Sequence, residues 1–290
     1  MKFAAFLWSL IVQALRINNR EFREIAALVY QLTGIQLKEQ KKSLLVARLS
    51  SRLKTLRLPG FDAYLGYIND VANRDKEIPY LINSITTNTT EFFRESGQFA
   101  FLESLLPRLI EEGERIGNKR LRVWCSACST GEEAYSLAMV LACFFKDKEA
   151  WNVRVLASDI DTDVLAAASA GIYSIERARA VPHRYRRPFL VRRKDLPPGY
   201  VAVSSRLRNM VVFRKVNLLA DSFRFRTPID IIFCRNVVIY FDEDGKRLLV
   251  EKFHDVLREG GYIFVGHSES LLLQRERFQF VESTIYRRNG

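Results

Sequence analysis

Cysteine is scarce in this chain, which has four cysteines among 290 residues. Cys125 and Cys128 form a Cys-x-x-Cys pair, but no second pair and no neighbouring histidine completes a zinc site, so we expect no metal. The scarcity argues against a disulfide-stapled scaffold and favours a reducing compartment. Glycine and proline number only 14 and 8, which excludes collagen-like and low-complexity classes.

The sequence also lacks an apolar run long enough to span a bilayer. Its long apolar run covers residues 3–15 and is interrupted by Ser9 and Gln13, whereas a membrane-spanning helix needs about 20 predominantly apolar residues. We therefore expect no direct insertion into a membrane. Residues 1–15 are interpreted as an apolar leader or a first helix, and a faint likeness to a signal peptide leaves export as an alternative.

Acidic residues are in deficit, because 33 Asp and Glu stand against 45 Lys and Arg, for a formal net charge of +12. Residues 16–57 hold ten Lys and Arg against three Glu, and residues 176–215 hold twelve against one Glu and one Asp. Two such basic segments predict an acidic macromolecular partner: nucleic acid, an anionic membrane surface or an acidic protein.

The first basic segment has apolar residues at helical spacing, which predicts a small all-α domain over residues 16–76 and a linker over residues 77–85. Lys41, Arg48 and Arg52 would share one helix face, either as a recognition surface for an acidic partner or as an ordinary solvated face. The apolar stripes that indicate about three helices are Phe22, Ile25, Ala26 and Val29; Leu45, Leu49, Leu53 and Leu56; and Tyr64, Leu65 and Ile68.

The remainder of the chain alternates short β-rich runs with helical ones. Nearly continuous apolar strands separated by helices predict an α/β fold with a mainly parallel sheet covered on both faces. The basic, proline-containing stretch at about residues 186–208 breaks the rhythm and predicts a small β insertion. The predicted strands are residues 121–124, 153–157, 210–216, 229–234 and 262–265, and the predicted helices are residues 135–145, 164–170 and 246–257.

Polar side chains follow several predicted strands, where open α/β sheets bind their ligands. Residues 125–133 combine small side chains with two acids at a helix start, a pattern that disfavours phosphate and suits a cationic or hydroxylated ligand. An acid after the second strand typically accepts hydrogen bonds from ribose hydroxyls, although Asp159 or Asp161 is equally suited to cap the next helix. Asn217, and the pair Arg235 and Asn236, follow the next two strands.

Five motifs together resemble the chemoreceptor protein-glutamate O-methyltransferases, the CheR family. They occur in the family's order, and the likeness runs from about Phe22 to the C-terminus. Residues 1–15 lie outside it, and Ala134 stands where the family often has proline. The motifs are residues 86–95 (TTNTTEFFRE), 129–136 (STGEEAYS), 157–161 (ASDID), 233–241 (FCRNVVIYF) and 266–270 (GHSES).

The resemblance implies a Rossmann-like methyltransferase domain over residues 86–290, with S-adenosylmethionine as methyl donor and S-adenosylhomocysteine as product. It implies that Arg94 and Tyr240 lie nearest the transferring methyl group as catalytic residues. For the cofactor site, Glu132 stays open as a lesser alternative to Glu133. The implied cofactor-binding residues are Asn88, Thr90, Arg94, Glu133, Asp159, Asn217, Leu218, Arg235 and Asn236.

The acceptor implied by the resemblance is a glutamate side chain on the cytoplasmic helices of membrane chemoreceptors, whose methyl esters serve sensory adaptation. Lys41, Arg48 and Arg52 would then bind the receptor through several weak, screened charge pairs. We expect a cytoplasmic monomer that is recruited to receptor arrays at the inner membrane. Whether the β insertion also grips a receptor peptide stays open.

The implied methyl transfer to glutamate agrees with the small number of reactive groups in the chain. A glutamate with a pKa of about 4.3 is already ionised at neutral pH, so no general base is required and catalysis is a matter of positioning. The alternatives are a nucleic-acid methyltransferase on the same fold and a catalytically silent receptor adaptor. The absence of an Asn-Pro-Pro-Tyr signature argues against nucleic acid as partner, and the intact motif residues argue against the adaptor.

Overall fold

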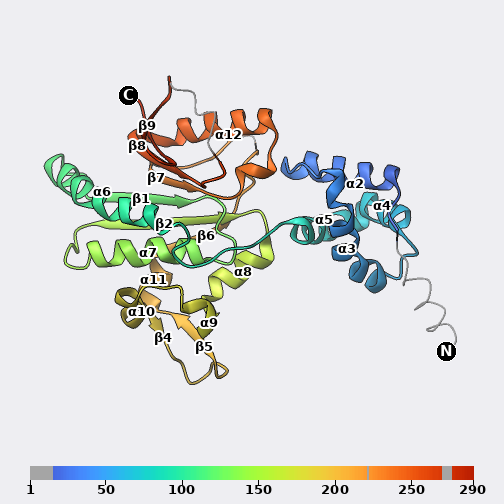
Figure 1. Ribbon diagram of the computed structural model, residues 1–290, viewed down its shortest axis with the longest axis horizontal. Helices are drawn as coiled ribbons and strands as arrows, with labels where there is room; N and C mark the ends of the chain where they lie inside the picture. Colours follow the sequence, from blue (N-terminus) through green and yellow to red (C-terminus); the bar gives the residue numbers. More distant parts are fainter. Residues whose placement is uncertain (1–15, 221, 270–275) are drawn as a thin grey trace. The chain divides into compact units, whose positions relative to one another are not determined.

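The computed structural model describes residues 16–220, 222–269 and 276–290 of the chain (Figure 1). The predicted leader, residues 1–15, lies outside these ranges. Within them, no helix combines the length and the apolar character that crossing a bilayer requires.

The chain divides into two compact units, each with its own hydrophobic core. The first unit is helical and holds the described residues up to Thr87 together with Tyr240–Asp242. The second unit holds Asn88–Ile239 and Glu243–Gly290 and is built around a sheet. The division falls two residues after the predicted domain start at residue 86.

The helical unit buries the apolar stripes that its sequence predicts, including Phe22 and Leu49. Its first helix begins at a capping box, in which Asn18 and Glu21 each accept the other's backbone N–H, and it ends at Gly34 with a φ of 73°. The helices are α2 (Asn19–Thr33), the short 3-10 helix η1 (Glu39–Lys41), α3 (Lys42–Leu56), α4 (Phe61–Asn69) and α5 (Val71–Ile85).

The prediction of a linker over residues 77–85 is wrong, because these residues form the second half of α5. Glu77, Leu81 and Ile85 are buried there, so this half of the helix contributes to the core. The polar residues 73–76, which suggested a domain end, lie on the preceding turns of the same helix. A polar stretch on a helix surface and a polar linker have the same composition, and only packing distinguishes them.

Arg52 is not part of an open basic face, because its guanidinium is bound within the helical unit. Its Nε donates to Glu77 Oε1 at 3.0 Å, and the guanidinium lies 4.3 Å from the centre of the Tyr80 ring. The Glu77 side chain is 1% exposed, and it also accepts a hydrogen bond from the Tyr64 hydroxyl at 2.9 Å. Arg52 therefore neutralises a buried carboxylate and joins α3 to α5.

The other two members of the predicted stripe also differ from expectation. Arg48 Nη1 donates to the carbonyl oxygens of Thr86, at 2.6 Å, and of Ser84, at 3.1 Å, so it caps the end of α5. Lys41 is exposed but ends η1, one residue before α3 begins. The expectation that Lys41, Arg48 and Arg52 share one solvated helix face is thus corrected, because α5 packs on the side of α3 that carries the two arginines.

The second unit contains a seven-stranded sheet with the strand order β6-β2-β1-β7-β8-β10-β9. The first five strands in this order pair in parallel, and β10 pairs antiparallel with β8 and β9. The mainly parallel sheet predicted from the sequence is confirmed. The strands are β1 (Arg120–Cys125), β2 (Asn152–Asp159), β6 (Val211–Lys215), β7 (Ile229–Cys234), β8 (Leu257–Val265), β9 (Phe278–Glu282) and β10 (Ile285–Arg288).

Helices cover the sheet on both faces, with α7 and α12 on opposite sides of it in Figure 1. All residues of the central strand β7 are buried, as expected for a parallel strand between two helical layers. The main helices of this unit are α6 (Ser96–Arg115), α7 (Glu132–Phe144), α8 (Thr162–Ala170) and α12 (Glu243–Val256), with a 3-10 helix η2 (Val238–Tyr240) after β7.

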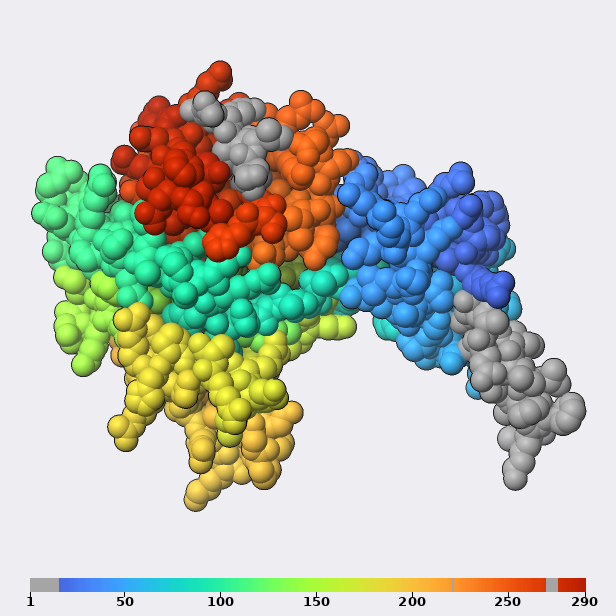
Figure 2. All heavy atoms as spheres, in the orientation of Figure 1, coloured from blue at the N-terminus to red at the C-terminus, as the bar shows by residue number. Residues whose placement is uncertain are grey.

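A small insertion separates α8 from β6, and its three antiparallel strands have the order β3-β5-β4. It begins at Ile172 rather than at about residue 186, because a first strand of three residues is too short to show a periodic pattern. Figure 2 shows it in yellow, projecting from the body of the sheet unit. Its elements are β3 (Ile172–Ser174), α9 (Ile175–Ala178), α10 (His183–Phe189), β4 (Leu190–Val191), β5 (Tyr200–Val203) and α11 (Ser205–Met210).

The substitution Arg52→Ala should lower the free energy of unfolding of the helical unit by about 2–3 kcal/mol, because it leaves the buried Glu77 carboxylate without its cation. Urea unfolding followed by circular dichroism measures the change. Lys54→Ala, at an exposed position of the same helix, is the control and should change the value by less than about 0.5 kcal/mol. Equal stability of the two variants would contradict the role assigned to Arg52.

Candidate active site

The candidate site lies at the carboxyl ends of the parallel strands. Because β2, β1 and β7 are neighbours in the sheet, the loops that follow them meet at one edge. The strands can be followed side by side in Figure 1. The segments after these three strands carry three of the five motifs seen in the sequence.

The loop between β1 and α7 has an unusual backbone conformation. Ser129 and Gly131 have φ values of 47° and 96°, both in the left-handed region. A Cβ atom on Gly131 would lie 2.8 Å from the hydroxyl oxygen of Tyr173, so the backbone angle and the close approach both require glycine.

Asp159 ends β2 and contacts the loop after β1. Its Oδ2 accepts the N–H of Ser129 at 2.8 Å, and its Oδ1 accepts the N–H of Asp161 at 3.1 Å. Burial raises the pKa of the Asp159 carboxyl, and the two N–H donors oppose that rise. Asp161, not Asp159, caps α8 by accepting the N–H groups of Asp163 and Val164. The structure thereby resolves which of the two acids is the helix cap.

The segment before α6 reaches the same loops. Asn88 Nδ2 donates to Asp161 Oδ2 at 2.8 Å, and Ser129 Oγ donates to the carbonyl oxygen of Asn88 at 3.0 Å. Thr90 and Arg94 follow in the same segment and are half-buried. Arg94 Nη1 donates to the carbonyl oxygen of Thr89 at 3.2 Å. The first motif thus lies beside the loops after β1 and β2.

Arg235, just after β7, is almost completely buried and makes several polar contacts. Its Nη1 donates to Glu133 Oε2 at 2.7 Å, and its Nη2 donates to the carbonyl oxygen of Arg94 at 2.6 Å. The Glu95 carboxylate lies 3.1 Å from Nη2, and Glu133 Oε1 accepts from Cys125 Sγ at 3.2 Å. Arg235 therefore holds Glu133 and the segment before α6 in place, and its direct contact with a cofactor stays a prediction.

The two adjacent acids at the start of α7 face different partners. Glu133 joins the Arg235 contacts, whereas Glu132 is fully buried, pairs with Arg177 of the insertion and accepts from Thr130 Oγ1 at 2.7 Å. Burial raises the pKa of both carboxyls, while the facing arginine lowers it in each case. Of the two alternatives, Glu133 is the one in the polar network at the strand ends.

Asn217 and Leu218 follow β6, the edge strand next to β2. The N–H of Val216 donates to the carbonyl oxygen of Asp159 at 3.0 Å, which places the two residues beside the end of β2. Asn217 Oδ1 accepts the N–H of Leu219 at 3.0 Å, and Leu218 is 6% exposed. The backbone of this turn is thus ordered by the side chain of Asn217.

Glu269 is a site residue to which sequence reasoning gave no role. Its carboxylate accepts the backbone N–H groups of Asn236 and Val238, each at 2.7 Å, and of Gly266 at 2.8 Å. Asn236 has a φ of 58°, and a Cβ on Gly266 would lie 2.7 Å from Glu269 Oε2. Glu269 thus joins the loops after β7 and β8. The GHSES motif, which contains Glu269, was the feature of the sequence that could have indicated this role.

Two family models match consecutive parts of the chain. The model described as CheR methyltransferase, SAM binding domain matches residues 88–287, and the one described as CheR methyltransferase, all-alpha domain matches residues 20–86. The chain belongs to the CheR methyltransferase family. The family resemblance inferred from the five motifs is confirmed, and so is its cofactor, S-adenosylmethionine, which the matched domain binds.

Similar proteins cover the chain nearly from end to end. The chemotaxis protein methyltransferase of Escherichia coli (strain K12) is 37% identical over 277 residues, which are 95% of this chain and 92% of that protein. The chemotaxis protein methyltransferase 2 of Pseudomonas aeruginosa is 36% identical over 274 residues, 94% of this chain and 95% of that protein. The chemotaxis protein methyltransferase of Borreliella burgdorferi is 35% identical over 277 residues, 95% of this chain and 96% of that protein.

The residues at the strand ends of this CheR chain fit S-adenosylmethionine chemically. Asp159 and Glu133 supply carboxylates, which suit ribose hydroxyls and the positive charges of the cofactor. Asn88, Asn217 and Asn236 add amides that both donate and accept, as adenine edges require. All five residues are polar and half-buried, and the Glu133 side chain is 13% exposed.

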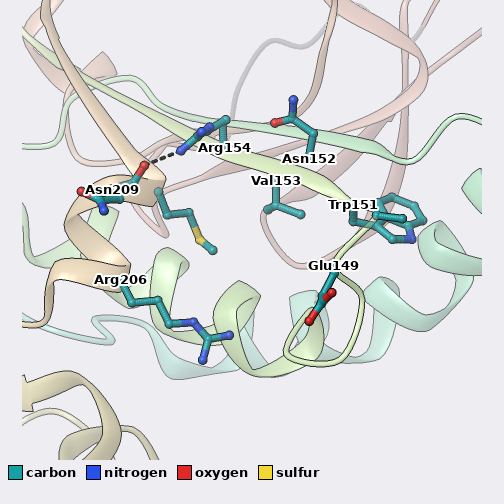
Figure 3. Close-up of a pocket in the computed structure, with 9 residues that line it drawn as sticks. Glu149, Trp151, Asn152, Val153, Arg154, Arg206 and Asn209 are labelled. Carbon is teal, nitrogen blue, oxygen red and sulfur yellow. Dashed lines mark hydrogen bonds between the residues drawn. The ribbon is translucent and has the colours of Figure 1, made fainter.

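A cavity of about 360 Å³ lies elsewhere in the CheR sheet unit, at the amino end of β2 (Figure 3). Asn152 and Arg154 line it, together with Arg206 and Asn209 of α11, and Arg154 donates to the carbonyl oxygen of Asn209. Asn152 and Asp159 are at opposite ends of β2, roughly 20 Å apart at 3.3 Å per residue. This cavity is therefore not part of the cofactor site.

Tyr240, the second predicted catalytic residue, is grouped with the helical unit rather than with the strand-end residues. It ends η2, and its carbonyl oxygen accepts the N–H of Gln36 at 2.9 Å. Tyr240 is half-buried. The catalytic roles of Tyr240 and Arg94 stay predictions of the CheR resemblance.

The substitution Asp159→Asn should weaken S-adenosylhomocysteine binding by about 1.5–3 kcal/mol, through loss of charge-assisted hydrogen bonds to the ribose. Isothermal titration calorimetry measures the change, and Asp163→Asn, an exposed position in α8, is the control. Because burial raises the pKa of Asp159 and its ionised form is the acceptor, wild-type affinity should fall on acidification at a higher pH than an ordinary aspartate would cause. Unchanged affinity in Asp159→Asn would remove Asp159 from the site.

Proposed function

We propose that this CheR methyltransferase transfers a methyl group from S-adenosylmethionine to glutamate side chains of chemoreceptors, forming methyl esters. The observation that carries the proposal is that residues of all five motifs within the sheet unit contact one another, in a chain whose relatives are named chemotaxis protein methyltransferases. Those relatives' names state methylation in chemotaxis but not the group that is methylated. The glutamate acceptor is therefore part of the proposal.

Methyl transfer to a carboxylate requires that the acceptor be correctly oriented, and it requires no proton transfer. The cofactor supplies an activated methyl group on a sulfonium, which is a good leaving group. An ionised acceptor glutamate needs no general base, so the chain's own residues must align its oxygen with the S–CH₃ bond. In the proposed mechanism the acceptor carboxylate is oriented either by Arg94 or by a hydrogen bond from the Tyr240 hydroxyl to the oxygen that does not attack.

Receptor recognition is proposed for the basic surface of the helical unit, meaning the exposed residues Arg20, Arg23, Lys38, Lys41 and Lys54. Lys41 is exposed and is the member of the predicted set Lys41, Arg48 and Arg52 that is accessible to an acidic receptor helix. Arg48 and Arg52 are engaged by α5, so we propose that they support this surface rather than supply its contacts. The proposed partners are the cytoplasmic helices of receptors in arrays at the inner membrane. We propose that the enzyme binds them as a monomer.

Methyl incorporation from labelled S-adenosylmethionine tests the proposed acceptor. The full chain is incubated with a chemoreceptor cytoplasmic fragment or with RNA, and products are analysed by mass spectrometry. We expect label on receptor glutamates that mild base releases as methanol, the behaviour of a carboxyl ester. Base-stable label, or label on RNA alone, would overturn the proposal without affecting the assignment of the cofactor.

Tyr240→Phe should lower kcat for receptor methylation about tenfold or more, with the dissociation constant for S-adenosylhomocysteine unchanged within a factor of about three. The reason is that a hydroxyl acting on the acceptor contributes to the transition state and not to cofactor binding. Tyr286→Phe, on β10, which β8 separates from β7 in the sheet, is the matched control. Full turnover in Tyr240→Phe would reduce the residue to a packing role.

A further inference from the structure

The insertion contacts the loop after β1 at residues 130–132. From α9, the Arg177 guanidinium forms an ion pair with Glu132 Oε1, and its Nη2 donates to Thr130 Oγ1 at 3.1 Å. From β3, the Tyr173 hydroxyl donates to the carbonyl oxygen of Thr130 at 2.6 Å. Two elements of the insertion thus hold three groups on residues 130–132.

The preceding residue of the same loop, Ser129, contacts two candidate cofactor residues. Ser129 N–H donates to Asp159 Oδ2, and Ser129 Oγ donates to the carbonyl oxygen of Asn88. The loop between these two sets of contacts has two residues in the left-handed region, Ser129 and Gly131. A non-glycine residue in that region is strained, and it persists only when its surroundings hold it there.

The electrostatics make the Arg177 contact stronger than a surface ion pair. The Glu132 side chain is 0% exposed, whereas that of Arg177 is 45% exposed. Burial raises the pKa of Glu132, and Thr130 and Arg177 oppose the rise. Without Arg177, the carboxylate would be left buried and uncompensated in the first turn of α7, so either the loop moves or the group becomes neutral.

Tyr173 is fixed by packing rather than by charge. It is 3% exposed, and its ring contacts Phe92 edge-on, with ring centres 4.9 Å apart. Phe92 belongs to the TTNTTEFFRE motif, so the same tyrosine contacts both that segment and the loop after β1. The missing side chain of Gly131 makes room for its hydroxyl.

We infer that Arg177 and Tyr173 are positioning residues for S-adenosylmethionine, and that the insertion holds the loop after β1 in its cofactor-binding conformation. The inference rests on the cofactor site proposed at the strand ends, but not on the identity of the methyl acceptor. It makes the insertion a determinant of cofactor affinity, although neither residue is expected to touch the cofactor. Any change in the insertion that displaces α9 or β3 would alter cofactor affinity, and the coupling is reciprocal.

Three variants test the Arg177 contact by calorimetry with S-adenosylhomocysteine. Arg177→Ala should raise the dissociation constant about tenfold, which corresponds to about 1.4 kcal/mol. Glu132→Gln should change it little, since an amide oxygen still accepts from Arg177, and the double variant should recover most of the loss because no charge is left buried. Arg179→Ala, exposed and two residues further on, is the matched control.

Steady-state kinetics provide a readout that general destabilisation would not give. Arg177→Ala should raise the KM for S-adenosylmethionine about as much as the dissociation constant and leave kcat unchanged at saturating cofactor. Unchanged affinity in Arg177→Ala, or a loss that Glu132→Gln does not recover, would overturn the inference. If Asp159→Asn weakens binding while Arg177→Ala does not, the cofactor site stands and the role of the insertion fails.

Tyr173→Phe provides a second test if Arg177→Ala does not fold. It removes only the hydroxyl that binds the carbonyl oxygen of Thr130, while the ring contact with Phe92 is kept. The dissociation constant for S-adenosylhomocysteine should rise about threefold to tenfold, as expected for one hydrogen bond. An unchanged value would overturn the role assigned to Tyr173.

Discussion

A carboxylate removed from water must be given a cation or several N–H donors, and this requirement organises both units of the molecule. Four glutamates whose side chains are buried or nearly so meet it. Each has at least one partner that lies more than twenty residues away in the sequence. The four are Glu77, paired with Arg52; Glu132, paired with Arg177; Glu133, paired with Arg235; and Glu269, which accepts three backbone N–H groups.

At the strand ends, these contacts fix the geometry of the candidate cofactor site. Arg235 orients Glu133 and the segment before α6, and Glu269 ties together the loops after β7 and β8. Groups that are already oriented lose little freedom on binding, which favours an enzyme whose chemistry depends on alignment. Burial raises the pKa of the Glu133 and Asp159 carboxyls, which opposes keeping them ionised there.

Much of the fold could be predicted because its periodic segments are strong. β7 was predicted with its observed bounds, and the parallel sheet followed from apolar runs alternating with helices. Elements without a clear pattern were missed: α6 contains Pro107, a residue that usually ends helices, and β3 has three residues. The supposed linker at residues 77–85 was misread because a helix with a polar outer face resembles a polar connection.

The candidate cofactor residues were implied by the family resemblance, and their contact with the cofactor stays a prediction. The loops that carry several of them lie together because the carboxyl ends of parallel strands share one edge. The sequence by itself determined the α/β class, the family and its cofactor. Which way each charged side chain points was decided only by the tertiary structure. Adjacent helix positions are rotated by about 100°, so Glu132 and Glu133 must face different neighbours. The partner that distinguishes Glu133, Arg235, lies 102 residues away in the sequence and is brought to it only by the fold.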